Sequence, residues 1–97
     1  MSHPSTPSQV FVFPGKLTHR EAMAERERLI RAVAEGATRI DMRALTSFDS
    51  TALAVMLAAL RAQDGSVHRV SFEGVPGKLR DLARLYGLQE VLADALS

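Results

Sequence analysis

The sequence contains no cysteine and no tryptophan, and only 5% of its 97 residues are aromatic. Without cysteine, the chain forms no disulfide and has no thiolate to act as a nucleophile or a metal ligand. Its stability must therefore come from a hydrophobic core. A chain of this length buries roughly 60–70% of its unfolded surface, which is enough for one core without covalent cross-links.

An excess of charge of one sign is also absent. Twelve Lys and Arg residues stand against eleven Asp and Glu residues, which leaves a net charge of +1. Such a chain has no strong field to attract nucleic acid or an anionic membrane. The longest apolar run, residues 52–60, is much shorter than the roughly 20 residues that a membrane-spanning helix needs. We therefore expect no nucleic-acid partner and no direct membrane insertion.

Several motifs of catalytic and cofactor-binding proteins are missing as well. Neither phosphate-binding glycine pattern, G-x-x-x-x-G-K-[ST] or G-x-G-x-x-G, occurs in the sequence. The histidines at positions 3, 19 and 68 lack metal-ligand spacing to one another or to a carboxylate. Ser50 has no nearby histidine or lysine in the sequence to activate it as a nucleophile. We expect no enzymatic activity, no metal and no cofactor.

The first eight residues, MSHPSTPS, do not show the basic and then apolar pattern of a secretory signal. We predict that residues 1–8 are a disordered lead-in and that residues 9–97 form a single domain. A cytoplasmic location is the default expectation for such a chain.

Apolar periodicity predicts that strands and helices alternate along the chain. Strands are expected at residues 9–13, 38–42 and 67–73. Helices are expected between residues 18 and 36, over residues 52–60 and between residues 76 and 87, followed by an apolar turn at residues 88–92. Thr18 and Glu21 fit a capping box, and Gly36 fits a left-handed helix end. The alternation predicts an α/β protein with parallel pairing and right-handed crossovers.

The stretch of residues 38–60 reads as a buried strand, a polar turn and a buried helix. Residues 52–60 are apolar throughout, which is typical of a helix buried on all sides. Asp49 and Ser50 lie where an N-cap belongs, and either side-chain oxygen could accept a hydrogen bond from a free N–H of the first turn. For Ser50, the residues alone favour this capping role over contact with a partner.

Two stretches resemble the STAS domain family (sulfate transporter and anti-sigma factor antagonist). The sequence Asp41-Met42-Arg43-Ala44-Leu45, followed by Asp49-Ser50-Thr51-Ala52-Leu53, is similar to the strand and helix opening of that family, with Ala52 in place of the usual glycine. The stretch VPGKLRDLARLYGL at residues 75–88 resembles the tail of the MlaB subfamily, the cytoplasmic STAS subunit of the Mla phospholipid-transport ABC complex. The resemblance covers roughly residues 10–92.

The resemblance implies an α/β fold of the STAS type, with a small mixed sheet of about four strands and three to four helices. STAS domains usually open with two strands that form a hairpin. Here only residues 9–13 read as a strand, because the Ser- and Pro-rich lead-in occupies the place of the other. The first strand of the family is therefore either missing or irregular in this chain, and the sequence does not decide which strand forms that edge of the sheet.

The resemblance also implies a function and a site. It suggests a non-enzymatic subunit that docks on the ATPase of an ABC-type phospholipid transporter, which maintains outer-membrane lipid asymmetry, and stabilises or regulates that ATPase. Such a subunit is cytoplasmic and peripheral to the inner membrane through its partner. The alternative is an anti-sigma factor antagonist that is switched by phosphorylation of Ser50. The partner-binding residues implied are Asp49, Ser50, Thr51 and Tyr86, although Tyr86 is equally compatible with core packing.

Overall fold

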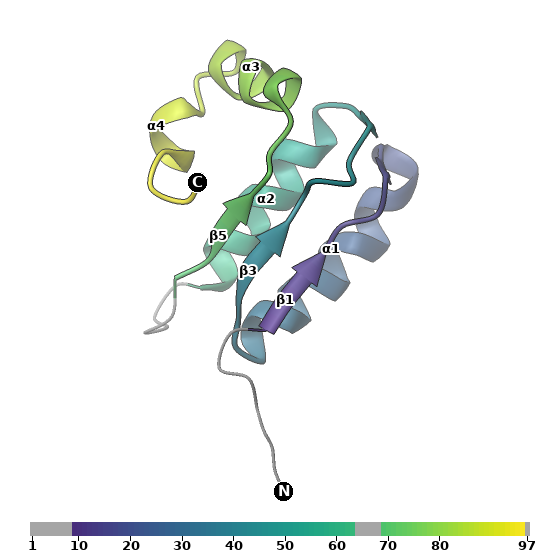
Figure 1. The fold of residues 1–97 in the computed structure, drawn as a ribbon, viewed down its shortest axis with the longest axis vertical. Coiled ribbons are helices and arrows are strands. Elements are labelled where there is room, and N and C mark those ends of the chain that lie inside the picture. Colours follow the sequence, from purple (N-terminus) through teal and green to yellow (C-terminus); the bar gives the residue numbers. More distant parts are fainter. Residues whose placement is uncertain (1–8, 64–68, 97) are drawn as a thin grey trace, which may run out of the picture.

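The computed structural model describes residues 9–63 and 69–96, and Figure 1 shows its course. Three sequence predictions fall wholly or partly outside these residues. They are the disordered lead-in at residues 1–8, the first two residues of the strand expected at 67–73, and the statements about the histidines at positions 3 and 68. In chain order the elements are β1 Gln9–Val12, β2 Lys16–Leu17, α1 His19–Ala34, β3 Ala37–Asp41, β4 Ser47–Phe48, α2 Thr51–Ala62, β5 Ser71–Glu73, α3 Gly77–Leu85 and α4 Gln89–Leu92.

The strands form a three-stranded sheet in the order β1-β3-β5 and a separate two-stranded pair, β2 with β4. The predicted α/β fold is confirmed. Every pairing among the described strands is parallel, so the sheet there is parallel where a mixed sheet was expected. The register places Ile40 of β3 between Phe11 of β1 and Phe72 of β5. Parallel pairing follows because α1 and α2 carry the chain back across the sheet between successive strands.

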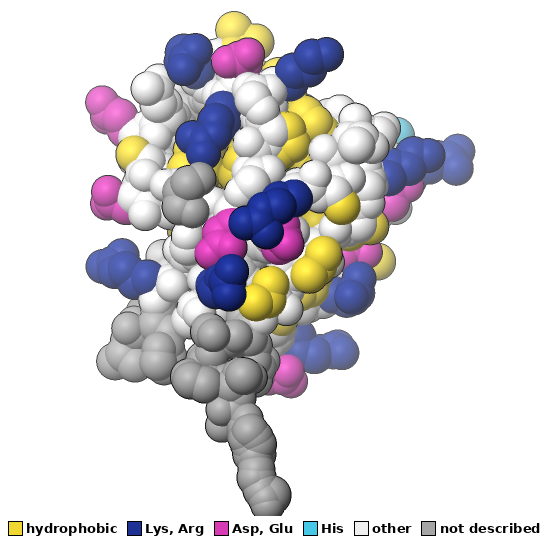
Figure 2. Space-filling model, viewed as in Figure 1, with side chains coloured by type: hydrophobic (Ala, Val, Ile, Leu, Met, Phe, Trp, Pro, Cys, Tyr) yellow, Lys and Arg dark blue, Asp and Glu magenta, His cyan; other side chains and the backbone are white. Residues whose placement is uncertain are grey.

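The molecule has two layers, with α1 and α2 on one face of the sheet (Figure 1). Side chains alternate along a strand, so every second residue points toward these helices. The inward residues are buried, and they include Phe11, Phe13, Ile40, Met42 and Phe72. The opposite face is open, and Figure 2 shows basic and acidic side chains gathered there beside hydrophobic ones.

The helix α2 supplies more of the core than any other described helix. Its buried residues are Ala52, Leu53, Val55, Met56, Ala58 and Ala59. However, Ala54 is exposed and Leu57 is half-buried, so the prediction of burial on all sides was wrong. The apolar run covers the whole circumference of α2, whereas the sheet and α1 cover only part of it.

The ends of α1 follow the sequence prediction. Glu21 Oε1 accepts hydrogen bonds from the Thr18 N–H at 2.8 Å and from the Thr18 hydroxyl at 2.7 Å, which completes the predicted capping box. Both bonds lower the pKa of Glu21, and the bond from the Thr18 hydroxyl has the larger effect. Gly36 has a φ of 106°, a conformation that glycine adopts without strain, and the helix ends just before it.

The C-terminal segment packs less deeply than the sequence suggested. Pro76 precedes α3, as expected, and Leu79 and Ala83 are buried. Leu85 and Tyr86, which were expected in the same apolar stripe, are 77% and 56% exposed. After α4 the chain reaches the sheet again: the N–H of Phe72 donates to the carbonyl of Ala95 at 2.7 Å.

No helix within residues 9–63 and 69–96 combines the length and the apolar character that crossing a membrane would require.

Candidate functional site at the N-terminus of α2

Asp49 organises the start of α2. Its Oδ1 accepts hydrogen bonds from the N–H of Thr51, at 2.9 Å, and from the Thr51 hydroxyl. Its Oδ2 accepts a bond from the N–H of His19, the first residue of α1, at 3.3 Å. The Thr51 hydroxyl, the Thr51 amide and the His19 amide together lower the pKa of Asp49, in that order of size. One carboxylate therefore joins the N-terminal ends of both long helices.

Ser50 does not cap the helix, so the prediction that favoured a capping role for its side chain was wrong. Its backbone is already helical, with φ −65° and ψ −16°, and its side chain makes no capping hydrogen bond. The reason is that Asp49 precedes the first turn and its carboxylate takes the free N–H of Thr51. The Ser50 side chain is exposed at the surface.

A groove runs from the start of α2 to the loop that joins α3 and α4. It has a volume of about 360 Å³ and is lined by Ser50, Leu53, Ala54, Leu57, Tyr86 and Leu88. We call it the Ser50–Tyr86 groove. The fold thus brings together two predicted site residues that are far apart in the sequence.

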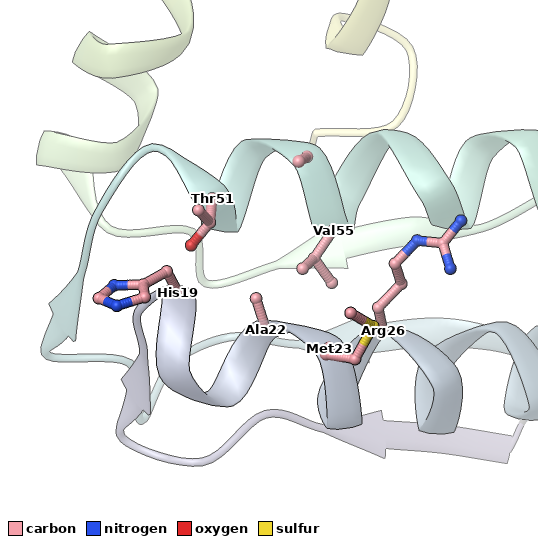
Figure 3. A pocket seen from close by; sticks show the side chains of 7 residues that line it. His19, Ala22, Met23, Arg26, Thr51 and Val55 are labelled. Carbon is pink, nitrogen blue, oxygen red and sulfur yellow. The ribbon is translucent and has the colours of Figure 1, made fainter.

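A second groove lies between α1 and α2, and Figure 3 shows it from close by. It has a volume of about 230 Å³ and is lined by His19, Ala22, Met23, Arg26, Thr51, Ala54 and Val55. Thr51, the third predicted site residue, lies here, where its hydroxyl is bound to Asp49. Asp49 lines neither groove, but its carboxylate holds Thr51, which does.

Ala54 is the one residue that lines both of these grooves. Sequence reasoning missed this residue, together with Met23 and Leu57 on either side of it. A signal was present: residues 50, 54 and 57 follow helical spacing and therefore share one face of α2. It was hidden because an uninterrupted apolar run gives no indication of which side of a helix remains uncovered.

These grooves suit binding better than bond-breaking chemistry. Their walls are mainly aliphatic, and the nearest acid and base, Asp49 and His19, are 3.9 Å apart between Oδ2 and Nδ1 at an exposed position. Among the residues that the structure describes, no group of three or more His, Asp or Glu side chains could hold a metal ion. A mainly apolar groove that also carries the hydroxyls of Ser50 and Tyr86 can accept apolar side chains from another protein.

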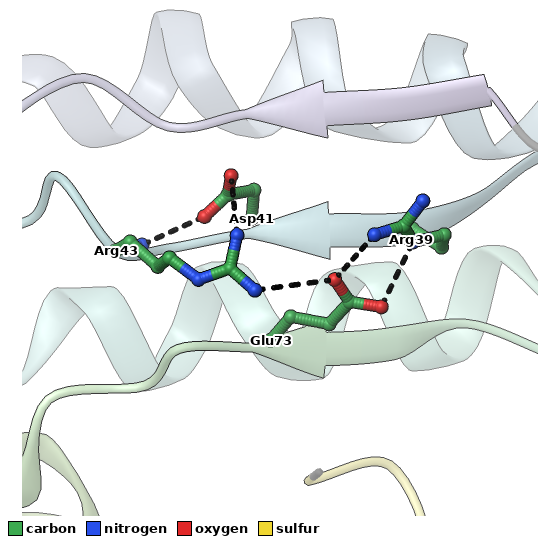
Figure 4. A network of polar contacts seen from close by, with 4 residues as sticks. All are labelled: Arg39, Asp41, Arg43 and Glu73. Carbon is green, nitrogen blue, oxygen red and sulfur yellow. Dashed lines mark hydrogen bonds and ion pairs between the residues drawn. The ribbon is translucent and has the colours of Figure 1, made fainter.

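A second polar cluster occupies the open face of the sheet, away from both grooves (Figure 4). Arg39 Nε donates to Glu73 Oε2 at 2.9 Å and Arg39 Nη2 donates to Glu73 Oε1 at 3.0 Å, so β3 and β5 are joined by a bidentate pair. Arg43 lies 3.4 Å from Asp41 and 4.0 Å from Glu73. The four charges balance, which is typical of a structural network and not of a site for a charged ligand.

A family model described as the MlaB STAS domain matches residues 7–94, nearly the whole chain. The chain belongs to this STAS family. The resemblance of residues 41–53 and 75–88 is therefore confirmed. STAS domains are generally non-catalytic binding domains, and membership of the family supports a general binding or regulatory role for this chain.

The STAS fold is also found among solved structures. A crystal structure of a sulfate transporter family protein from Wolinella succinogenes is similar, with a TM-score of 0.72 and 14% sequence identity. The match covers 95% of this chain and 77% of that one. At this identity the likeness shows the fold alone. A search of curated proteins finds no match.

Proposed function

We propose that this STAS domain is a non-enzymatic subunit that docks, through the Ser50–Tyr86 groove, on the ATPase of an ABC-type phospholipid transporter. The observation that carries the proposal is that Ser50 and Tyr86 line one groove in a chain whose family is that of MlaB. In this role the protein stabilises or regulates the ATPase and is peripheral to the inner membrane, on the cytoplasmic side, through that partner.

The chemistry of the groove supports a protein partner. Tyr86 is 56% exposed, and tyrosine offers a large apolar surface with a hydroxyl at its tip, a combination that is common at interface centres. The Ser50 side chain is exposed beside it and makes no capping bond, so its hydroxyl is available to a partner. Leu53 and Leu57 supply the apolar floor.

The test is a titration of the co-expressed ATPase with two variants, one on each side of the groove. Ser50→Asp places a carboxylate where a hydroxyl fitted, and burying an unpaired charge is costly. Tyr86→Ala removes the exposed ring. We expect each variant to weaken binding at least tenfold, equivalent to about 1.4 kcal/mol. The melting temperature should change little, because Ser50 makes no capping bond and Tyr86 is mostly exposed.

Glu27→Ala, on the exposed side of α1, is the control and should bind like the wild type. Wild-type affinity in both groove variants would overturn the proposed docking site. Failure of the wild-type protein to bind any phospholipid-transporter ATPase would overturn the proposed function itself.

The second candidate is an anti-sigma factor antagonist controlled by phosphorylation of Ser50. One observation favours it: the Ser50 hydroxyl is exposed and not used as a cap, whereas the Thr51 hydroxyl is bound to Asp49. A kinase would therefore meet Ser50 first. Mass spectrometry after incubation with the anti-sigma kinases of the source cell tests this candidate, and unmodified Ser50 under all conditions would exclude it.

A further inference from the structure

The two edges of the three-stranded sheet differ in one respect. At β5, the chain covers its own edge: Phe72 donates to the carbonyl of Ala95, and Phe72 and Leu96 form a parallel bridge. At β1, the sheet ends, and β3 is the only strand that pairs with it among the described residues. In Figure 1 the C-terminal segment lies beside β5, and β1 lies at the opposite side of the sheet.

The outward edge of β1 presents hydrogen-bonding groups from Val10 and Val12. The N–H of Phe13 donates to the carbonyl of Asp41 in β3 at 3.0 Å, so Phe13 turns its backbone groups inward. Backbone groups alternate along a strand, so Phe11 also faces β3, while Val10 and Val12 face away from it. No strand in the described part of the chain pairs with these groups, and such a row is a template for another strand.

Within residues 9–63 and 69–96, this edge lacks the usual protection against pairing. Residues 9–13, QVFVF, contain no charge and no proline, and the side chains of Val10 and Val12 are 43% and 55% exposed. Edge strands are normally blunted by a charged residue, a proline or a cover. The irregularity of the β1–β3 pairing lies only at its beginning, between Gln9 and Val10.

We propose that a second copy of this chain pairs with the edge of β1 in an antiparallel dimer, with the two-fold axis near Phe11. Val10 of each copy then lies opposite Val12 of the other, and about four backbone hydrogen bonds form, two for each such pair. The edge is self-complementary in this arrangement, because both copies present the same short V-x-V segment, bounded by Pro14. The result is one continuous sheet with α1 of each copy on the same side.

The charges near the edge permit this approach. Arg28 lies over the ring of Phe11, 5.3 Å from its centroid, and is paired with Glu25 at 2.9 Å. Two copies therefore bring two neutral pairs together, and the net charge of +1 adds little repulsion. The contact is short, so it falls at the small end of specific interfaces and forms a reversible dimer. The Ser50–Tyr86 groove, which is not part of this edge, stays open, so dimerisation is independent of the proposed docking.

Sedimentation of the full chain over a concentration series tests the dimer. We expect the average mass to rise from 10.6 kDa toward twice that value. Val12→Pro removes an outward N–H and leaves the inward bonds of Phe11 and Phe13 to β3. It should raise the dimer dissociation constant about tenfold or more, because about half of the intermolecular bonds lose their donor. Val12→Thr keeps both the β-branched shape and the N–H, and should dimerise like the wild type.

Amide hydrogen exchange supplies a second readout that does not depend on the folding of a variant. The amides of Val10 and Val12 should become protected as the concentration rises, while that of Phe13 should be protected throughout. A single mass near 10.6 kDa at every concentration would overturn the proposed dimer. The same result would be found if the edge bound a strand of another protein and not a second copy, and that outcome would also overturn the proposal. A dimer that forms without protection of Val10 and Val12, or that tolerates Val12→Pro, would also overturn it.

Discussion

The neighbouring hydroxyls of Ser50 and Thr51 have different surroundings although both begin α2. Thr51 donates its hydroxyl to Asp49, and its amide is bound to the same oxygen. Ser50 makes no capping bond and its side chain lies at the surface, in the groove that it shares with Tyr86. Asp49 and Thr51 therefore make the hydrogen bonds that stabilise the start of α2, which leaves the Ser50 hydroxyl available for contact with a partner.

This division predicts different effects of alanine at adjacent positions. Asp49→Ala removes the oxygens that accept from Thr51 and His19, so it should lower the melting temperature clearly. Ser50→Ala should leave it nearly unchanged, because no capping bond is lost. Thermal melts followed by circular dichroism compare the two variants. Equal losses at both positions would show that Ser50 contributes to the cap in solution.

At the scale of elements, α2 has a buried side and a side that lines the grooves. Its buried side packs against the sheet and α1, where Met56 is 1% exposed. Its other side carries Ser50, Ala54 and Leu57, which line the grooves.

The two sides predict different energetic effects of truncation. Met56→Ala should lower the free energy of unfolding by about 2–5 kcal/mol, because a fully buried side chain leaves a cavity. This is a large fraction of the total, about 5–15 kcal/mol. Leu57→Ala should cost only about 1 kcal/mol, since Leu57 is half-buried and water fills its place. Urea denaturation measures both. A larger loss for Leu57→Ala would mean that the groove is closed in solution.

At the scale of the whole molecule, charged side chains on the open face of the sheet join β3 to β5. The hydrogen bonds from Arg39 are the main cause that lowers the pKa of Glu73, and the charges of Arg39 and Arg43 add to it. A carboxylate with a lowered pKa in the folded state stabilises the protein above its unfolded-state pKa. That contribution is lost as the pH falls through the folded-state pKa.

Acid should therefore destabilise the protein in the range where Glu73 gains its proton. We expect the melting temperature to fall as the pH is lowered from about 6 to below about 4. Asp49 and Glu21 act in the same direction, since the pKa of each is lowered by its hydrogen bonds. Glu73→Gln should reduce this dependence, whereas Glu27→Gln, on the exposed side of α1, should not. An unchanged acid dependence in Glu73→Gln would show that the pair with Arg39 does not persist in solution.

Local patterns in the sequence determined the order and type of the main elements. Capping by Thr18 and Glu21 and the helix end at Gly36 depend on neighbours a few residues apart, so they could be read directly. The family motifs were readable for the same reason, because each lies within one continuous stretch.

Only the tertiary structure decided how these elements divide buried from exposed surface. The apolar run of α2 could not indicate that Ala54 faces outward, because burial depends on what packs against each side. The exposure of Tyr86 and its place beside Ser50 arise from the packing of the α3–α4 segment near α2. The choice between Asp49 and Ser50 as the cap depended on backbone geometry, since both carry a suitable oxygen and only Asp49 reaches the free N–H.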